Sequence, residues 1–488
     1  MLRRTKIVAT LGPATDDPQV LERLLSAGVN MVRLNFSHGD TATQLERARN
    51  VCRLRDELGL NVAILVDLQG PKIRIARFRD GPITLKPGDS FVLDAALAPD
   101  AGDVHQVGID YPGLPADCEP GDTLLLADGY IELRVTDVVD TRIETQVVIG
   151  GELGNNKGIN RKGGGLAAPA LTAKDREDMF SAAALGADYV AISFVRNARD
   201  MEEGRALLQS AGCNAGLVAK IERADAVADG QVLDEIIQAA DAVMVARGDL
   251  GVEVGDWELV GLQKQIIRRA YTLNRVVITA TQMMESMIEN PVPTRAEVFD
   301  VANAVLDGTD AVMLSAESAV GRYPVEAVHA MARVCLGAEK YSSARSSTYR
   351  VDTEFGRVDE AIAMGTMYIA NHLPGVRAVI SLTESGSTPL WMSRIASVQP
   401  IYALSRHPET LRRVAVFRGV EGVHYDCTEV PEDAVNKEAV DLLERRGVVQ
   451  PGDLVMVTEG DSRGFPGATN TLRILAVGQT FRGAYRPS

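Results

Sequence analysis

The chain has 488 residues, more than one ordinary domain holds, so two or three domains are expected. Its 51 lysine and arginine residues against 66 aspartate and glutamate residues give a net charge of −15, which argues against nucleic acid or anionic membrane as the main partner. No apolar run approaches the roughly 18 residues of a membrane span. Five scattered cysteines without CxxC spacing, together with a first segment that lacks a signal-peptide core, predict a cytoplasmic protein.

Short runs rich in valine, isoleucine, alanine and leucine alternate with amphipathic stretches over the first two thirds of the chain. This alternation is typical of parallel strands covered by helices. Eight such runs predict a closed (β/α)8 TIM barrel. The runs are residues 5–10, 29–34, 62–67, 189–193, 216–220, 242–246, 275–280 and 311–315.

One gap, between the third and fourth runs, is several times longer than the others. Residues 71–167 within it alternate apolar and polar side chains between Pro-Gly-Asp and Ala-Asp-Gly-Tyr turns, which predicts a small β domain. Because this insertion leaves from the carboxyl end of the third strand, it would hang over the barrel mouth as a lid. The barrel domain would then comprise residues 1–70 and 168–345.

A polar stretch at residues 342–349 is typical of a linker, and a further α/β domain is expected over residues 346–488. Its strand candidates are residues 378–383, 400–404, 423–426, 454–458 and 472–477, too few for another barrel. The predicted fold class is therefore α/β, a TIM barrel with an inserted small β-barrel lid domain and a C-terminal α/β domain.

Barrel active sites lie at the carboxyl ends of the strands, and those ends are unusually polar in this chain. Glu222 and Asp249 offer oxygen ligands suited to Mg2+. The cations that could balance phosphate are Arg33, Arg74, Lys220 and Arg247. Taken singly, Lys220 with Glu222 reads equally well as an internal ion pair, and Arg247-Gly-Asp as a turn. Their convergence from different strands favours a site for metal-assisted phosphate chemistry, although the usual nucleotide-binding loops are missing.

The chain resembles the pyruvate kinase family over nearly its whole length. The resemblance rests on many segments in a fixed order, for example Lys220-Ile-Glu222 and Thr281-Gln-Met283. The matching segments are residues 4–7, 12–13, 33–39, 70–71 with 74, 157–160, 193–194, 220–222, 246–251, 280–283, 285–287, 293–297, 307–321 and 469–471.

The resemblance implies transfer of a phosphoryl group from phosphoenolpyruvate to ADP, giving pyruvate and ATP in the last step of glycolysis. It implies Mg2+ or Mn2+ on Glu222 and Asp249, with Lys220 stabilising the phosphoryl group in flight and Thr281 relaying a proton to the enol. The implied catalytic residues are Lys220, Thr281, Arg33 and Arg74. The implied substrate-binding residues are Arg33, Lys220, Gly248, Asp249, Thr281 and Ser193. The implied nucleotide-binding residues are Asn35, His38, Arg74 and Lys174.

One position departs from the potassium-dependent branch of the family, because Lys72 stands where that branch has glutamate. A fixed ammonium there could replace a bound monovalent cation, so we expect activity largely independent of K+. The ligands of a potassium site, which the sequence retains, would be Asn35, Ser37, Asp67 and Leu68.

In the last domain, a hydroxyl-rich loop follows a predicted strand and precedes a helical segment. The loop residues are Thr383, Ser385, Gly386, Ser387 and Thr388. They could simply cap the helix, but by resemblance to family members with an effector phosphate here, we expect a sugar-phosphate activator. The resemblance also implies a homotetramer.

Two rival functions remain on sequence alone. One is a barrel lyase or aldolase acting on phosphoenolpyruvate or pyruvate, which would need neither the lid nor an ADP site. The other is a catalytically silent sensor of sugar phosphate, against which the intact Lys220, Glu222, Asp249 and Thr281 argue.

Overall fold

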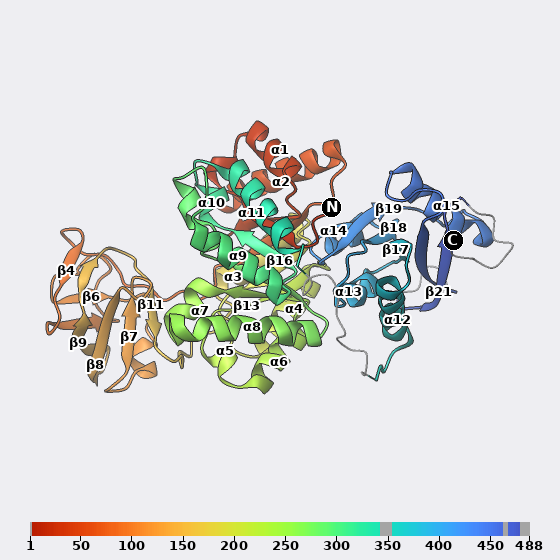
Figure 1. Ribbon diagram of the computed structural model, residues 1–488. Coiled ribbons are helices and arrows are strands. Elements are labelled where there is room, and N and C mark those ends of the chain that lie inside the picture. Colours follow the sequence, from red (N-terminus) through yellow and green to blue (C-terminus); the bar gives the residue numbers. More distant parts are fainter. Residues whose placement is uncertain (1, 342–353, 462–466, 479–488) are drawn as a thin grey trace.

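The computed structural model describes residues 2–341, 354–461 and 467–478. A central barrel has the inserted β domain on one side and the C-terminal domain on the opposite side (Figure 1). The linker predicted at residues 342–349 lies outside the described residues. None of the helices in the described ranges has the length and apolar character that crossing a membrane requires.

The eight predicted runs form one closed barrel of parallel strands, in the order β1-β16-β15-β14-β13-β12-β3-β2. The strands are β1 (Lys6–Thr10), β2 (Met31–Asn35), β3 (Ala63–Asp67), β12 (Tyr189–Ile192), β13 (Gly216–Ile221), β14 (Ala242–Ala246), β15 (Val276–Ala280) and β16 (Ala311–Leu314). The TIM-barrel prediction is confirmed, and each run agrees with its strand to within two residues at either end.

Helices on the outside of the barrel begin and end at local signals. Asp40 accepts a hydrogen bond from the Thr43 amide at the start of α2, and Thr294 with Glu297 forms a capping box at the start of α9. Gly59 and Gly308 take the left-handed conformation that ends those two helices. The helices are α1 (Pro18–Ser26), α2 (Thr41–Leu58), α3 (Ala173–Ala184), α4 (Ala198–Ser210), α5 (Asp225–Ala228), α6 (Gly230–Ala239), α7 (Arg247–Val254), α8 (Asp256–Thr272), α9 (Arg295–Asp307), α10 (Ala316–Ala319) and α11 (Pro324–Ala338).

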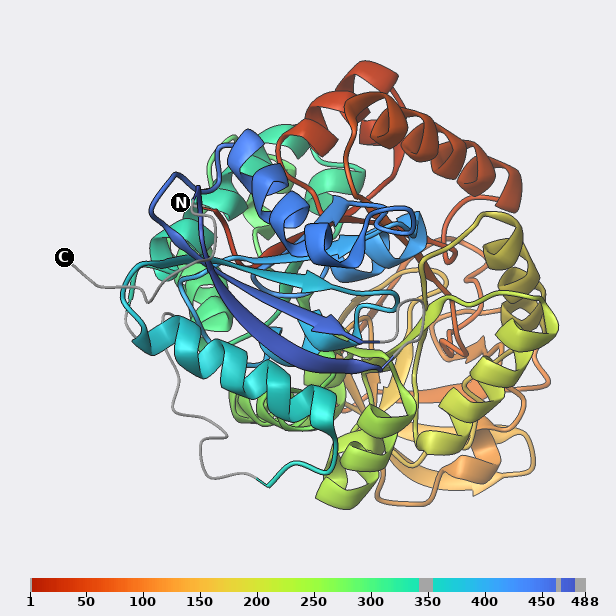
Figure 2. The same cartoon turned by 90° about the vertical axis from the view of Figure 1, so that its right-hand side faces the viewer.

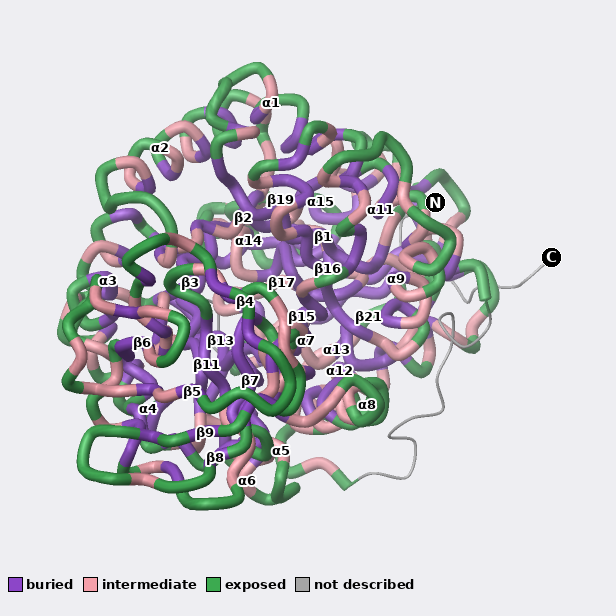
Figure 3. The backbone as a smooth tube through the Cα atoms, turned by 90° about the vertical axis from the view of Figure 1, so that its left-hand side faces the viewer, coloured by how far each residue is buried: buried purple, intermediate pink, exposed green. Residues whose placement is uncertain are grey.

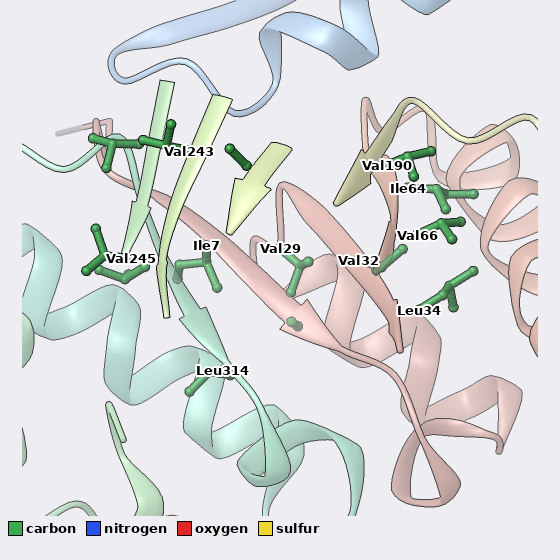
Figure 4. Close-up of a cluster of buried hydrophobic side chains, with 14 of the residues drawn as sticks. Ile7, Val29, Val32, Leu34, Ile64, Val66, Val190, Val243, Val245 and Leu314 are labelled. Carbon is green, nitrogen blue, oxygen red and sulfur yellow. The ribbon is translucent and has the colours of Figure 1, made fainter. Parts of the chain in front are cut away.

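Alternate residues of the barrel strands belong to two different apolar cores. Ile7, Val32 and Ile64 pack in the layer between the strands and the surrounding helices (Figure 4). Their neighbours Val8 and Met31 belong to a second core that fills the barrel and continues into the C-terminal domain. Because successive side chains of a strand point to opposite faces, strands buried on both faces read as the continuous apolar runs seen in the sequence.

The inserted domain leaves the barrel after β3 and returns before α3, as expected. Its strands pair into a six-stranded sheet and a two-stranded sheet that share one apolar core. Figure 3 views this domain from its own side, with buried stretches inside and exposed loops around them. The strands are β4 (Ile83–Leu85), β5 (Ser90–Asp94), β6 (Gln106–Gly108), β7 (Thr123–Leu126), β8 (Ile131–Val139), β9 (Arg142–Ile149), β10 (Gly151–Leu153) and β11 (Ile159–Arg161).

The C-terminal domain is the open α/β sheet that its sequence predicts, in the order β19-β18-β17-β20-β21 with an antiparallel last strand. It covers the amino end of the barrel, as Figure 2 shows from that side. Across this junction Arg394 pairs with Asp310, both fully buried, and Arg412 Nε lies 2.7 Å from Asp188 Oδ1. The elements are β17 (Val376–Leu382), β18 (Ile401–Ser405), β19 (Val420–His424), β20 (Leu454–Gly460), β21 (Thr469–Ala476), α12 (Val358–His372), α13 (Ser387–Ser393), α14 (Pro408–Val414) and α15 (Glu432–Arg445).

Candidate active site

Lys220, the next-to-last residue of β13, stands at the centre of a buried polar cluster. Its Nζ lies 2.8 Å from Glu222 Oε1 and 3.3 Å from Asp67 Oδ1, and it donates a 2.8 Å hydrogen bond to Ser193 Oγ. Ser193 in turn donates to the Leu68 carbonyl at 2.8 Å. The carboxyl ends of β3, β12 and β13 thus meet around one ammonium group.

Lys220, Arg33 and Asp67 favour the ionised state of one another. Burial alone would raise the pKa of Asp67, but Lys220 and Arg33 outweigh it and bring that pKa below its ordinary value. Burial would likewise lower the pKa of Lys220, whereas the carboxylates of Asp67 and Glu222 raise it. The raised pKa favours the charged ammonium of Lys220 at the barrel mouth.

Arg33, on β2, lies beside this cluster. Its Nε is 2.6 Å from Asp67 Oδ2, and its Nη1 donates a 3.1 Å hydrogen bond to Thr10 Oγ1. The side chain is 12 % exposed, so the guanidinium is largely removed from water. Arg33 and Lys220, both expected to face phosphate, are thus joined through Asp67, which the sequence suggested only as a potassium ligand.

Glu222 and Asp249, the expected metal ligands, lie close enough to influence each other. Burial raises the pKa of Glu222; Lys220 opposes this effect, and the negative charge of Asp249 adds to it. The two buried carboxylates repel each other, and a divalent cation bound between them would stabilise their charged forms. The described residues contain no group of three or more His, Cys, Asp and Glu side chains arranged around a metal position. Two protein carboxylates leave room for substrate oxygens in the coordination shell, so the donors fit Mg2+.

Two lysines already approach these carboxylates. Lys220 contacts Glu222, and Lys72 Nζ donates a 2.9 Å hydrogen bond to Asp249 Oδ1. Lys72 is about one quarter exposed, and it reaches the site from the first residues of the inserted segment. Its ammonium lies on the metal side of the site, rather than against Asp67.

Thr281 directly follows β15 and has a left-handed backbone, with φ of +65°. Positive φ is unusual for a β-branched residue and indicates local strain. Its hydroxyl donates to the Ala280 carbonyl at 2.7 Å and accepts a 2.9 Å hydrogen bond from the Gly248 amide, the second residue of α7. The predicted proton-relay and carboxylate-binding residues therefore touch each other.

Arg247 is not available to balance phosphate, contrary to the sequence-based assignment. Its Nη1 lies 2.8 Å from Asp300 of α9, and its Nε donates to the carbonyls of Ala280 and Thr281 at 3.2 Å. Nη2 also donates to the Gln282 carbonyl at 3.2 Å. Arg247 thus holds the strained turn that presents Thr281. The sequence contained no signal that Asp300, 53 residues away, would take this arginine.

Three of the four residues expected on the nucleotide side, Asn35, His38 and Lys174, gather around the loop after β2. Asn35 Oδ1 accepts from the Ser37 amide at 3.1 Å, and the carbonyls of Asn35 and His38 accept from Gln44 at 3.0 and 2.8 Å. The His38 side chain is exposed. Lys174, on α3, reaches the same loop, where its Nζ pairs with Asp178 and donates to the Phe36 carbonyl at 3.3 Å.

Arg74 is turned toward the inserted domain. Its amide donates to Asp110 at 2.7 Å, and its Nη1 donates to the Asn156 carbonyl at 3.0 Å. These partners belong to the lid, so the structure does not bring Arg74 together with Arg33. Sequence order alone suggested proximity, because Arg33 lies near the end of β2 and Arg74 follows the neighbouring strand β3.

The loop between β17 and α13 lines a cavity of about 210 Å3 in the C-terminal domain. Gly386, with φ of +86°, donates from its amide to Thr383 Oγ1 at 2.9 Å, while the Ser385 and Ser387 hydroxyls lie 2.9 Å apart. Thr388 hydrogen-bonds Thr469 of β21 at 2.9 Å. Four of the five predicted effector residues line this cavity, and Gly386 shapes the turn between them.

A junction that sequence reasoning missed joins α7 to the lid. Glu253 accepts hydrogen bonds from the Ala224 amide at 2.8 Å and from Asn160 Nδ2 at 3.4 Å, and its carbonyl accepts from the Gly163 amide at 3.0 Å. Burial raises the pKa of Glu253 to about 7. The only sequence signal was a carboxylate on the buried side of a short helix.

A parallel barrel whose carboxyl-end rim combines buried carboxylates with a buried lysine and arginine defines an enzyme for anionic substrates. The family model described as "Pyruvate kinase, barrel domain" matches residues 2–328, and "Pyruvate kinase, alpha/beta domain" matches residues 360–475. The chain belongs to the pyruvate kinase family and is a phosphotransferase.

Individual relatives agree with this assignment. The chain is 58% identical over 476 residues to pyruvate kinase II of Salmonella typhimurium, covering 98% of this chain and 99% of that protein. It is 55% identical over 470 residues to a pyruvate kinase of Haemophilus influenzae, covering 96% and 97%. A crystal structure of a pyruvate kinase from Cryptosporidium parvum has a TM-score of 0.90 at 32% identity, covering 97% of this chain and 96% of that one.

Proposed function

We propose that the protein transfers the phosphoryl group of phosphoenolpyruvate to ADP, giving pyruvate and ATP, at the carboxyl-end rim of the barrel. The observation that carries this proposal is the buried ammonium of Lys220, within reach of Asp67, Glu222 and Ser193. A fixed cation in a water-poor site stabilises charge that develops on a phosphoryl group during its transfer. Family membership supports the same reaction.

The residue roles follow from position. Lys220 faces the phosphoryl group and the enolate left behind, and Arg33 and Ser193 hold the phosphoryl end. Backbone amides around Gly248 and Asp249, at the start of α7, bind the substrate carboxylate, and the Gly248 amide exchanges its present hydrogen bond to Thr281 when it does so. Thr281, whose hydroxyl contacts the Gly248 amide, passes a proton through water to the enol carbon.

Glu222 and Asp249 hold the divalent ion, Mg2+ or Mn2+. Such an ion, when bound, neutralises phosphoryl oxygens and orients them for transfer. On the opposite side, Asn35, His38 and Lys174 bind the nucleotide. Arg74 reaches its phosphates when the lid moves toward the barrel, which agrees with the present contacts of Arg74 to the lid.

Replacing Lys220 by methionine tests the central role. Turnover should fall by orders of magnitude, about 10² or more, because the charge that stabilises the transition state is lost. The assay supplies ADP and phosphoenolpyruvate and detects pyruvate, which also separates the kinase from a lyase and from a silent sensor. Lys437→Met, which removes an exposed lysine paired with Asp441 on α15, is the matched control. Near-normal turnover of Lys220→Met would refute the assignment.

We also propose that Lys72 makes activity largely independent of K+. Its contact with Asp249 places a fixed positive charge in the site without a bound monovalent ion. The ligands of the alternative potassium site are Asn35, Ser37, Asp67 and Leu68, of which Asp67 is already paired with Arg33 and Lys220. Initial rates should be similar with and without K+, whereas Lys72→Glu should require it. A large stimulation of the native enzyme by K+ would overturn the proposal.

The loop Thr383–Thr388 is proposed to bind the phosphate of a sugar-phosphate activator. The cavity beside it is lined by hydroxyl groups, donors suited to an anion, and by Arg406, whose Nε lies 3.4 Å from Glu384 Oε2. Ser387→Asp places a negative charge in the loop and should abolish activation while basal turnover is retained. Activation unchanged from the native enzyme would remove this loop from the effector site.

The domain limits are proposed as residues 1–70 with 168–345, 71–167 and 346–488, in agreement with the sheet to which each strand belongs.

We further propose a cytoplasmic homotetramer. Large apolar side chains are exposed on the adjacent helices α8 and α9, where Trp257 is 78 % and Phe299 68 % exposed. Trp257→Lys should weaken assembly in sedimentation experiments.

A further inference from the structure

The lid is joined to the barrel by two chain connections, an outgoing one at residues 68–72 and a returning one at residues 163–168, here called the return strap. In each connection a barrel carboxylate holds a glycine amide. The Gly70 amide donates to Asp175 Oδ1 at 3.0 Å, and the Gly165 amide donates to both carboxylate oxygens of Asp225 at 3.1 Å. Movement of the lid relative to the barrel therefore acts on these two attachments.

The outgoing attachment is tightly fixed. Asp175 is fully buried and also accepts from the Thr172 amide at 2.9 Å, in the capping box of α3. Gly70 has φ of +66°, and a Cβ there would lie 2.7 Å from Ser193 Cβ. Pro71 follows directly and has a restricted φ. Buried hydrogen bonds, close packing and a proline together make this connection a fixed point.

The return strap is attached more loosely. Gly163, Gly164 and Gly165 all have left-handed backbones, with φ of +83°, +84° and +87°, a succession that suits only glycine. Gly163 and Gly165 are exposed, and the Asp225 side chain is 35 % exposed. Water therefore competes for the hydrogen bond between Asp225 and the Gly165 amide, whereas it is excluded from Asp175.

The end of the strap is held by the lid through its side chains and by the barrel through its backbone. Leu166 and Ala168 pack in the apolar core of the lid. The Leu166 carbonyl accepts a 2.7 Å hydrogen bond from Arg223 Nη2, which also lies 3.2 Å from Asp225 Oδ2. Release of the strap backbone from the barrel would thus free the lid without disturbing the core of the lid.

Packing beside the strap is incomplete. A cavity of about 20 Å3, large enough for one water molecule, is lined by residues of both connections together with Arg223 and Glu253. Arg223 Nε is buried and has no hydrogen-bond partner among the described residues. Segments that are exposed and loosely packed open at low cost in free energy. Local opening is therefore expected at the strap rather than at Gly70.

We propose that Asp225 is a releasable latch for the lid. The lid turns about its fixed connection at Gly70, and loss of the hydrogen bond from the Gly165 amide to Asp225 frees the return strap. The latch opposes closure, because the present lid position keeps Arg74 on lid residues. Asp225 is thus a positioning residue that acts through the lid. Its effect on the reaction rests on the proposed kinase function, whereas the latch itself does not.

Hydrogen–deuterium exchange of the native protein, measured without substrates, tests the latch. In Asp225→Ala, exchange over residues 163–168 should be about tenfold faster or more, because a charge-assisted hydrogen bond is lost. Residues 68–72 should exchange as before. Asp229→Ala, which removes the exposed cap of the neighbouring helix α6, is the matched control and should leave the strap unchanged. Unchanged strap exchange in Asp225→Ala, or an equal rise at residues 68–72, would overturn the proposal.

Two glycine variants test the same contact from the strap. A Cβ at Gly164 would lie 2.7 Å from Asp225 Oδ1, whereas a Cβ at Gly163 would meet nothing within 4 Å. Both positions have the same sign and size of φ, so Gly163→Ala reports the backbone strain alone. Gly164→Ala should therefore raise strap exchange more than Gly163→Ala does. Adding Asp225→Ala to Gly164→Ala should give no further rise, and a full additional rise would contradict the latch.

Initial rates separate a latch from a purely structural contact. Because closure no longer has to break the latch, KM for ADP should fall about threefold or more in Asp225→Ala, while KM for phosphoenolpyruvate and Tm change little. A rise in both KM values would refute the latch. Should Asp225→Ala fail to fold, Asp225→Asn, which keeps one oxygen acceptor, should show the same changes at smaller size. Absence of turnover in the native protein would refute the kinase reaction alone, since the exchange experiment needs no substrate.

Discussion

At the scale of single residues, strain and charge are concentrated at the ends of the barrel strands. Thr281 and Phe194 both have positive φ, at +65° and +55°. Each holds a functional group in place, because Thr281 contacts the Gly248 amide and the Phe194 amide donates to Glu222 at 2.8 Å. Surrounding contacts maintain a strained backbone at such positions. At Thr281 this contact is the hydrogen bond from Arg247 Nε to the Thr281 carbonyl.

The Thr281 hydroxyl provides the first prediction. Thr281→Ala should lower turnover about a hundredfold, since proton delivery to the enol carbon is impaired. Incorporation of deuterium from heavy water into the pyruvate methyl group, followed by NMR, should slow in parallel, while KM for phosphoenolpyruvate changes little. Thr281→Ser keeps the hydroxyl and relieves part of the strain, so it should retain most activity. Equal losses in the two variants would contradict the proton-relay role.

At the scale of elements, α7 connects the metal side of the site to the lid. Its first turn carries Asp249, and its last turn carries Glu253, which contacts Asn160 and Gly163 of the returning lid segment. Helix α7 therefore joins the returning lid segment to the turn that bears Asp249 within eight residues.

Glu253 predicts a pH dependence of stability. Its pKa is raised from 4.5 to about 7, so the folded state holds the proton more tightly than the unfolded chain. The stability that this group contributes is complete below pH 4.5 and is lost as pH rises through about 7. Glu253→Gln should therefore be more stable than the native protein at pH 8, by up to about 3 kcal/mol. Denaturant unfolding at pH 5 and pH 8 measures this; a difference that does not change with pH would refute it.

At the scale of the whole molecule, the C-terminal domain closes the amino end of the barrel around a buried ion pair. Arg394 stacks at 4.8 Å on the Tyr271 ring and pairs with Asp310, which also accepts from the Val277 and Arg418 amides at 2.9 and 3.1 Å. The barrel interior and the C-terminal domain share one apolar core. The two parts therefore depend on each other for stability.

Removal of Arg394 is the third prediction. Arg394→Met leaves Asp310 buried without its cation, at a cost of about 3–5 kcal/mol, and should lower Tm by several degrees. Arg377→Met, which breaks a surface pair with Asp453, should change Tm little. Scanning calorimetry compares the two variants, and equal Tm values would show that the interdomain pair contributes no more than a surface pair.

Apolar periodicity was sufficient to predict the barrel and its strands, because strands buried on both faces carry their signal within a few consecutive residues. The insertion was predicted from the long gap that interrupts the regular spacing of those apolar runs. Lys220, Glu222, Asp249 and Arg33 were predicted to converge because the carboxyl ends of parallel strands meet at one rim. These parts of the fold and site depend on local sequence and on one topological rule.

By itself, then, the sequence determined the barrel, the insertion, the final α/β sheet and the polar rim of the site. Only the tertiary structure decided which cation faces which partner. Arg247 turns to Asp300, Arg74 turns to the lid, and Lys72 reaches Asp249, 177 residues away. It also decided that the C-terminal domain covers the amino end of the barrel and leaves a cavity there that is lined by both arginines and carboxylates. The ion-pair partner of a long flexible side chain is the opposite charge that lies within its reach. Which charge lies within reach depends on the packing of segments far apart in the chain.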